Sequence, residues 1–174
     1  MRNLKALCLV LVAAMAASFS LASVAADKIA VVDITTAIFS SNAAQESIKQ
    51  AESNADFIAL KAKLDGSVAD YQSLAKEAET KRLTWSQEQL QSHKKKMDYV
   101  KADAELASQK LQAENKQLQQ KIMQKLAPLA QEAVQAVVTE EGVTILLRAE
   151  SVVIAGQESN LTAKVTDRLN QLTK

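Results

Sequence analysis

Residues that cross-link or interrupt a chain are scarce in this sequence. Its 174 residues include one cysteine, one proline, three glycines and six aromatic side chains (one Trp, two Tyr and three Phe). Cys8 lies near the start, so no disulfide framework or thiol chemistry is available to the rest of the chain. Gly66, Gly142 and Gly156 do not form the glycine-rich loop between a strand and a helix that cradles phosphates. ATP-driven work is therefore excluded.

The sequence also lacks a constellation typical of catalysis or metal binding. His93 is the only histidine, and no cysteine lies near it. We interpret it as a solvated residue of a helical arm rather than as a metal ligand or catalytic base. Carboxylates lie four residues from lysines, as Glu77 does from Lys81, which is typical of ion pairs on a helix surface. We predict a protein that is not an enzyme and that binds no cofactor or metal.

The first 25 residues have the pattern of a secretory signal peptide. Arg2 and Lys5 give a positive start, residues 6–17 form a short apolar run, and residues 23–25 offer a cleavage site. The run is shorter than the ~20 apolar residues that a membrane span needs. A membrane anchor or an amphipathic first helix is the alternative. We expect residues 1–25 to be removed on export, which would leave a chain without cysteine.

The charge balance does not indicate a nucleic-acid partner. Without Arg2 and Lys5, 19 of the 21 basic residues stand against 20 acidic residues, a net charge of −1. The distribution is uneven, because residues 76–101 carry seven basic and four acidic side chains. This segment therefore has a net charge of +3, and the other residues after position 25 together have −4.

Residues 42–141 predict a long antiparallel helical hairpin. Their composition favours helix but is too polar to bury a core alone. The apolar pattern lapses at residues 81–87, where Thr84 and Gln87 have the spacing of a capping box that starts a new helix. The hairpin therefore spans residues 45–126, with its tip near 83–86. Its arms carry two stripes typical of coiled coils, namely Phe57, Leu60, Leu64, Tyr71, Leu74 and Ala78, and Leu90, Met97, Val100, Ala104, Ala107, Leu111 and Leu118.

Three residues interrupt or end the predicted arms. Gly66 costs the outgoing arm ~1 kcal/mol relative to alanine; it is either a tolerated surface glycine or a candidate hinge. Pro128 removes a backbone donor and predicts a kink. The strict heptad is lost over residues 118–133, which indicates passage into the body. Gly142 predicts a left-handed helix end.

Residues 26–44 and 127–174 predict a small α+β body. Residues 28–33 are apolar on both alternating faces, which indicates a strand buried on both sides. Residues 143–148 and 152–155 predict a hairpin of two strands, and Asn160 is positioned to cap a last amphipathic helix. A body this small, with three short strands, buries too little apolar surface to fold alone. We therefore expect self-association.

The hairpin tip carries candidate contact residues with two interpretations each. Trp85 either packs back over the turn or contacts an apolar client or lipid. The lysines at 94–96 either form a solvated face or, with the cations across the hairpin, contact anionic lipid or lipopolysaccharide phosphates. The candidate contacts are Lys81, Arg82, Trp85, Lys94, Lys95 and Lys96.

Both ends of the chain resemble the Skp/OmpH family of periplasmic chaperones. The resemblance rests on residues 26–32 (ADKIAVV), 142–147 (GVTILL), 152–155 (VVIA) and 160–169 (NLTAKVTDRL), and it covers the chain from residue 26 onward. It implies that three copies join strands into a small β-barrel, from which three helical tentacles enclose unfolded outer-membrane proteins. The implied strand residues of the trimer are Ile29, Val31, Ile145, Leu147 and Val153. The alternative is a structural coiled-coil adaptor or spacer in an envelope assembly.

Overall fold

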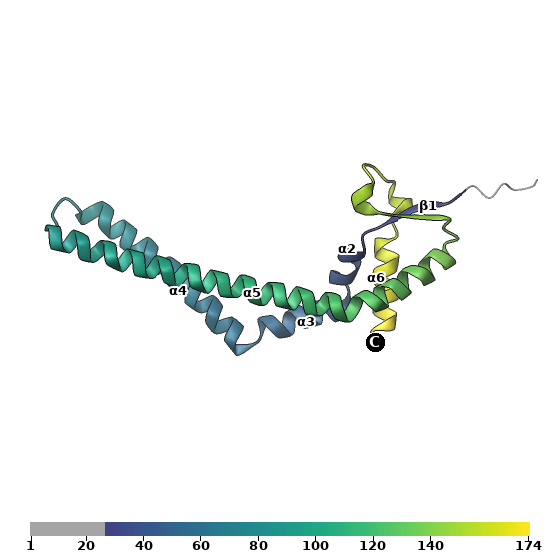
Figure 1. The fold of residues 1–174 in the computed structure, drawn as a ribbon, viewed down its shortest axis with the longest axis horizontal. Coiled ribbons are helices and arrows are strands. Elements are labelled where there is room, and N and C mark those ends of the chain that lie inside the picture. Colours follow the sequence, from purple (N-terminus) through teal and green to yellow (C-terminus); the bar gives the residue numbers. More distant parts are fainter. Residues whose placement is uncertain (1–26) are drawn as a thin grey trace, which may run out of the picture.

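A computed structural model describes residues 27–174, and the predicted signal peptide lies outside the described residues. A long helical hairpin projects from a small body that the two ends of the chain build together (Figure 1). The predicted fold class, mostly α with a small β part, is confirmed for the single chain, whereas the barrel and the homotrimer stay predictions. The elements are β1 (Ile29–Val32), α2 (Ile34–Phe39), α3 (Asn42–Glu52), α4 (Ala55–Lys81), α5 (Gln87–Glu140), β2 (Ile145–Arg148), the 3-10 turns η2 (Ala149–Ser151) and η3 (Gln157–Ser159), and α6 (Thr162–Leu172).

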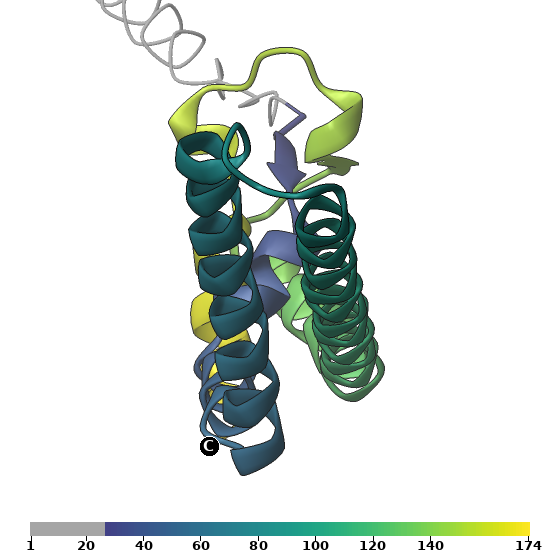
Figure 2. The ribbon, with the colours of Figure 1, turned by 90° about the vertical axis from the view of Figure 1, so that its left-hand side faces the viewer.

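The arms α4 and α5 lie side by side along a shallow seam (Figure 2). The central seam residues are small or half-buried, as predicted from the apolar stripes: Leu60, Leu64, Ser67 and Leu74 on α4, and Met97, Val100, Ala104, Ala107 and Leu111 on α5. Tyr71 and Leu90 were placed on the same stripes but are exposed. No side chain of α4 is fully buried. Many partial contacts therefore hold the arms together.

The turn between the arms spans residues 82–86, and its cap differs from the predicted one. Ser86, not Thr84, begins α5: the Ser86 hydroxyl accepts a hydrogen bond from the Gln89 amide (3.3 Å), and Gln89 Oε1 accepts one from the Ser86 amide (2.8 Å). The prediction of a box formed by Thr84 and Gln87 is wrong, because Thr84 donates its hydroxyl proton to the Lys81 carbonyl (2.8 Å). The Lys81 carbonyl thus accepts from both the amide (2.9 Å) and the hydroxyl of Thr84, which ties the turn to the end of α4.

The outgoing arm is interrupted between α3 and α4. Ser53 ends α3, and Asn54 Oδ1 accepts a hydrogen bond from the Asp56 amide (2.8 Å), so a new helix begins in a different direction (Figure 1). Helix α4 continues through Gly66 without a break. The role of Gly66 as a hinge of the outgoing arm stays a prediction.

The return arm α5 is one helix of 54 residues with Pro128 inside it. Pro128 has no amide proton to donate to the carbonyl four residues earlier in the helix. This side of the helix is exposed, so that carbonyl faces solvent. The helix does not break at Pro128 but curves where it enters the body (Figure 1). It ends as predicted at Gly142, whose φ is +62°. The amides of Gly142 and Val143 donate to the carbonyls of Thr139 (3.3 Å) and Val138 (3.0 Å), which is the Schellman pattern.

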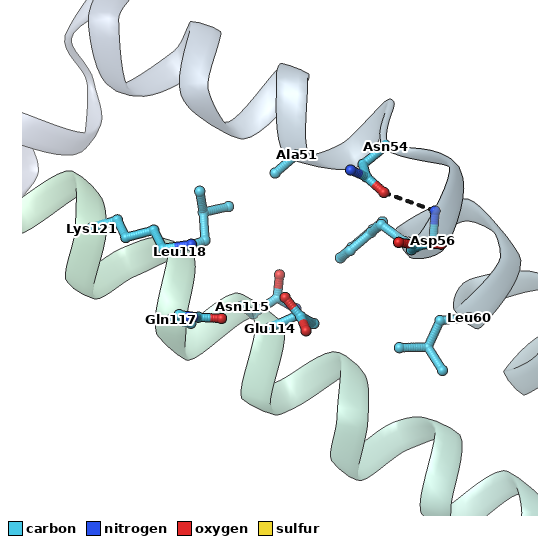
Figure 3. Close-up of a pocket in the computed structure, with 10 residues that line it drawn as sticks. Ala51, Asn54, Asp56, Leu60, Glu114, Asn115, Gln117, Leu118 and Lys121 are labelled. Atoms are coloured by element: carbon cyan, nitrogen blue, oxygen red, sulfur yellow. Dashed lines mark hydrogen bonds between the residues drawn. The ribbon is translucent and has the colours of Figure 1, made fainter.

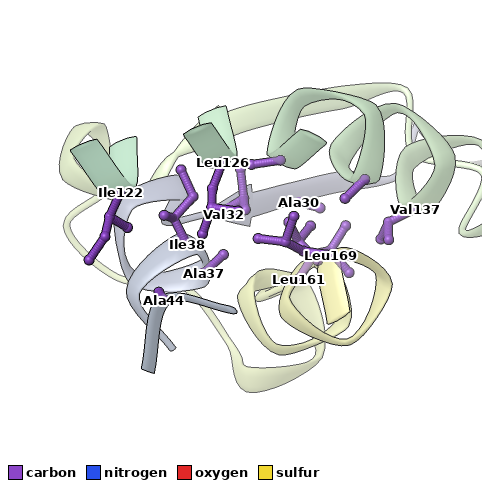
Figure 4. Close-up of a cluster of buried hydrophobic side chains, with 13 residues drawn as sticks. Ala30, Val32, Ala37, Ile38, Ala44, Ile122, Leu126, Val137, Leu161 and Leu169 are labelled. Carbon is purple, nitrogen blue, oxygen red and sulfur yellow. The ribbon is translucent and has the colours of Figure 1, made fainter. Parts of the chain in front are cut away.

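The body packs β1 and α2 against α6 and the last turns of α5 (Figure 4). Strand β1 is buried on both faces from Ala30 to Val32, as predicted, and pairs in parallel with β2. The core extends into the predicted hairpin segment, because Ile122 and Leu126 belong to it. Its buried members are Ala30, Val32, Ala37, Ile38, Ala44, Ile122, Leu126, Ala130, Ala133, Val137, Leu161, Val165 and Leu169.

The predicted strand at residues 152–155 does not form. The turn η2 follows β2 directly, and Val153 and Ile154 are 98% and 88% exposed. The other edge of β1 is occupied instead by residues that precede α6, since Asn160 bridges to Val31 and the Leu161 amide donates to the Val31 carbonyl (2.9 Å). Asn160 Oδ1 also accepts from the Thr162 amide (3.0 Å), close to its predicted capping role. The predicted hairpin of residues 143–148 and 152–155 is therefore wrong: η2 follows β2 in place of a tight reverse turn, and residues 152–155 do not pair with the open edge of β2.

None of the helices within residues 27–174 combines the length and the apolar character that a membrane crossing requires.

Candidate functional site: the hairpin and the exposed edge of the body

An aromatic cluster closes the seam at the hairpin tip. The rings of Trp85 and His93 are in tilted contact, with centroids 4.4 Å apart and an interplanar angle of 40°. His93 Nε2 lies 2.9 Å from the carbonyl oxygen of Leu74 on the opposite arm. Only 9% of His93 is exposed, so its interpretation as a solvated arm residue is wrong. The cause is its seam position, which directs the ring at α4 while Trp85 covers it. This geometry favours the interpretation in which Trp85 packs back over the turn.

Glu77 provides the negative charge of this cluster. Its Oε1 lies 3.1 Å from Lys81 Nζ, and its Oε2 lies 3.9 Å from His93 Nδ1. The pKa of Glu77 is lowered, chiefly by the hydrogen bond from Lys81 and then by the charge of the same lysine. The carboxylate therefore stays ionised at neutral pH and lies between two partners.

The other candidate tip residues are exposed around this cluster. Lys81 and Arg82 end the outgoing arm, and the lysines at 94–96 lie in the first turns of the return arm. Leu83, at the apex, is 90% exposed. The hairpin therefore gathers cations from two segments at one end, beside an apolar side chain that is free for contact. Which ligand these side chains meet stays a prediction.

A cavity lies beneath the interruption of the outgoing arm, which the sequence analysis did not anticipate (Figure 3). It measures about 300 Å³ and exists because α3 and α4 diverge from α5 at Asn54. Phe57, Leu60 and Leu118 give it apolar walls, while Glu114 and Lys121 bring charge of both signs. It could accept an apolar side chain. The signal for it was available, since Ser53 and Asn54 are strong helix-capping residues.

The body exposes an apolar strip at the outer edge of its sheet. Strand β2 pairs only with β1 among the described residues, so its second edge is open. Four of the five predicted strand residues, Ile29, Ile145, Leu147 and Val153, are exposed. Val31 differs, because it is buried within its own chain; the part of all five residues in a trimer stays a prediction. An open edge beside contiguous apolar side chains is typical of an association surface.

Residues 27–174 contain no group of three histidine, cysteine, aspartate or glutamate side chains that could hold a metal ion.

A family model described as outer membrane protein (OmpH-like) matches residues 28–169, from the start of β1 into α6. The chain belongs to the OmpH-like family. Both arms and nearly the whole body of this OmpH-like chain lie within the match, which confirms the family indicated by the two ends of the sequence. No curated protein matches the sequence.

Among solved structures, the OmpH-like chain is similar to a crystal structure from Caulobacter crescentus CB15 described as an outer membrane chaperone (OmpH-like). The two chains share 19% sequence identity, and the TM-score is 0.47. The alignment covers 84% of this chain and 85% of the Caulobacter chain.

Proposed function

We propose that this protein is an ATP-independent periplasmic chaperone that holds unfolded outer-membrane proteins and prevents their aggregation during transit. Membership of the OmpH-like family is the observation that carries the proposal. The signal-peptide pattern of residues 1–25 supports a periplasmic location. Because the sequence contains no phosphate-binding loop, release of the client is driven by its insertion into the outer membrane rather than by a bound nucleotide.

The arms have the surface that such a role requires. Large apolar side chains lie exposed along both helices, separated by polar residues, including Ile58 and Val68 on α4 and Tyr99 and Leu106 on α5. An unfolded barrel protein presents alternating apolar residues and unpaired strand edges. Many weak contacts to several arms give avidity without one tight site. A client is therefore held without being fixed in one conformation.

The proposed assembly is a homotrimer whose sheets join into a small barrel. The open edge of β2 supplies unpaired backbone groups, and Ile29, Ile145 and Leu147 supply the apolar surface beside it. Closure of three such sheets removes the open edges. The three hairpins then project from one base and enclose the client.

The decisive experiment measures light scattering by a urea-unfolded outer-membrane barrel protein after dilution into buffer. We expect one trimer of the mature protein per client to suppress the rise in scattering, whereas a helical protein of similar mass and charge does not. Unchanged aggregation at this ratio would contradict the proposal.

The basic tip supports a second partner, an anionic lipid surface or lipopolysaccharide. The exposed Leu83 amid Lys81, Arg82 and the lysines at 94–96 combines an apolar contact with cations. Flotation with vesicles containing anionic lipid tests it.

If the protein is instead a spacer with one folded partner at the tip, Trp85→Ala or Lys95→Ala abolishes a single saturable site, whereas a chaperone with distributed contacts loses little by either change.

A further inference from the structure

The buried imidazole at the hairpin tip has no part in the proposed chaperone function. His93 is the only histidine of the chain, and Trp85 is the only tryptophan. Their rings are in tilted contact at the point where the seam ends. Histidine is the side chain whose ordinary protonation change falls between pH 5 and 8. The tip therefore places the one imidazole of the chain against its one indole.

The contacts of the ring define its neutral tautomer. The Leu74 carbonyl oxygen, 2.9 Å from Nε2, can only accept a hydrogen bond, so Nε2 carries the proton. Nδ1 then presents a lone pair toward Glu77 Oε2 at 3.9 Å, and two acceptors face each other. When Nδ1 takes up a proton, both ring nitrogens become donors and each faces an oxygen on α4. The geometry of the cluster thus suits the protonated ring at both nitrogens.

The charged groups around the ring act in opposite directions. From α4, the Glu77 carboxylate attracts a second proton and Lys81 repels it. From α5, the ammonium groups of Lys94 and Lys96 repel this proton. Lys94 directly follows His93, and the charge of Lys96 also acts on Glu77. From the turn, the face of the Trp85 ring attracts a cation. Among these groups, Glu77 is the one that offers Nδ1 an acceptor.

We propose that the hairpin tip is a pH-responsive contact, in which protonated His93 donates from Nδ1 to Glu77 Oε2 while Glu77 Oε1 keeps its contact with Lys81. The net charge of residues 76–101 then rises from +3 to +4, because the seven basic and four acidic side chains are joined by the imidazolium. A mildly acidic medium therefore makes the tip more strongly basic without changing the fold. The inference does not depend on the proposed function.

Fluorescence of Trp85 in the purified mature protein tests the contact between the rings. We expect its emission to fall reversibly as the pH is lowered from 8 to 5, because an imidazolium in contact with indole quenches it. The variant His93→Gln keeps an amide donor for the Leu74 carbonyl but cannot gain charge, so its emission stays constant. Lys95→Gln, which removes one positive charge from the exposed side of the same turn, retains the native profile. Circular dichroism checks that each variant keeps its helices.

The contact between His93 and Glu77 is tested by NMR of the Glu77 side-chain carboxyl carbon. We expect this signal to shift in step with the loss of Trp85 emission, and to show no shift over this pH range in His93→Gln. A native emission that is constant from pH 8 to 5, or an emission loss that persists in His93→Gln, would overturn the inference. An emission loss with no accompanying movement of the Glu77 signal would also overturn it, because His93 would then titrate without engaging the carboxylate.

Discussion

Glu141 joins three distant parts of the chain through one carboxylate. At the end of α5, it accepts hydrogen bonds from Lys28, which precedes β1 (2.9 Å to Oε2), and from Lys164 of α6. The hydrogen bond from Lys164, followed by that from Lys28, lowers the pKa of Glu141 to about 2. A carboxyl group with a lowered pKa stabilises the folded state above its unfolded pKa of 4.5, and this stabilisation is lost as the pH falls through about 2.

Glu141→Gln is therefore expected to lower the Tm at pH 7. The difference from the native protein should be constant above about pH 5, shrink as the pH falls below 4.5, and vanish near pH 2. Thermal unfolding followed by circular dichroism at a series of pH values measures it. Glu132→Gln, at an exposed site of the same helix, serves as the control and should show little difference at any pH. A difference that grows as the pH falls would contradict the assignment.

Leu126 is the residue through which the return arm enters the core. It is 1% exposed, so Leu126→Ala should lower the free energy of unfolding by about 2–5 kcal/mol through lost burial and the cavity that remains. Leu106→Ala, at an exposed site of the same helix, should change it by less than about 0.5 kcal/mol. Urea unfolding compares the two variants. Equal effects would show that the arm and the body do not differ in packing.

At the scale of the element, Gly66 separates two interpretations of the outgoing arm. A Cβ atom at Gly66 would meet nothing within 4 Å, so Gly66→Ala should stabilise α4 by about 1 kcal/mol. Ala62→Gly, at an exposed site of the same helix, should have the opposite effect of similar size. If Gly66 is a hinge, Gly66→Ala also suppresses aggregation of large clients less well. If it is a tolerated glycine, only the stability measured by urea unfolding changes.

The elements that follow from long periodic patterns were predictable, and those decided by single contacts were not. Two apolar stripes of similar length on either side of a lapse in the apolar pattern indicate a helical hairpin. Gly142 ends α5 because glycine adopts a positive φ at little cost. The choice between Thr84 and Ser86 as a cap depends on which hydroxyl meets a free backbone amide of α5; Ser86 does so, whereas Thr84 donates to a carbonyl of α4. The burial of His93 depends on Trp85 folding over it, which no spacing encodes. The interruption at Asn54, and with it the arm cavity, was the one missed feature with a clear local signal.

At the scale of the whole molecule, the exposed segment after β2 marks the expected interface between copies. Val153 and Ile154 contribute almost nothing to the single chain, since they are 98% and 88% exposed. The double change of both residues to aspartate should therefore leave the helices intact and separate the copies, because it would bury unpaired charge between them. Multi-angle light scattering should give the mass of three chains for the native mature protein and of one chain for this variant.

Leu83→Asp provides the matched control for this experiment, because Leu83 is equally exposed but lies at the hairpin tip. It should keep the mass of three chains. A native protein that is a stable monomer would refute the proposed trimer. A trimer that survives the double aspartate change would place the interface elsewhere on the body.

The parallel pairing of β1 with β2 has a consequence for how the polypeptide acquires its shape. Lys28 and Glu141, which meet beside these strands, are 113 positions apart in the sequence. During synthesis β1 emerges long before β2 exists, so the two strands can pair only after almost all of the chain has been synthesised. Closing so long a loop at random is entropically costly, whereas zipping the coil upward from its turn shortens the loop step by step. Formation of the helical hairpin thereby brings the two ends of the polypeptide close together.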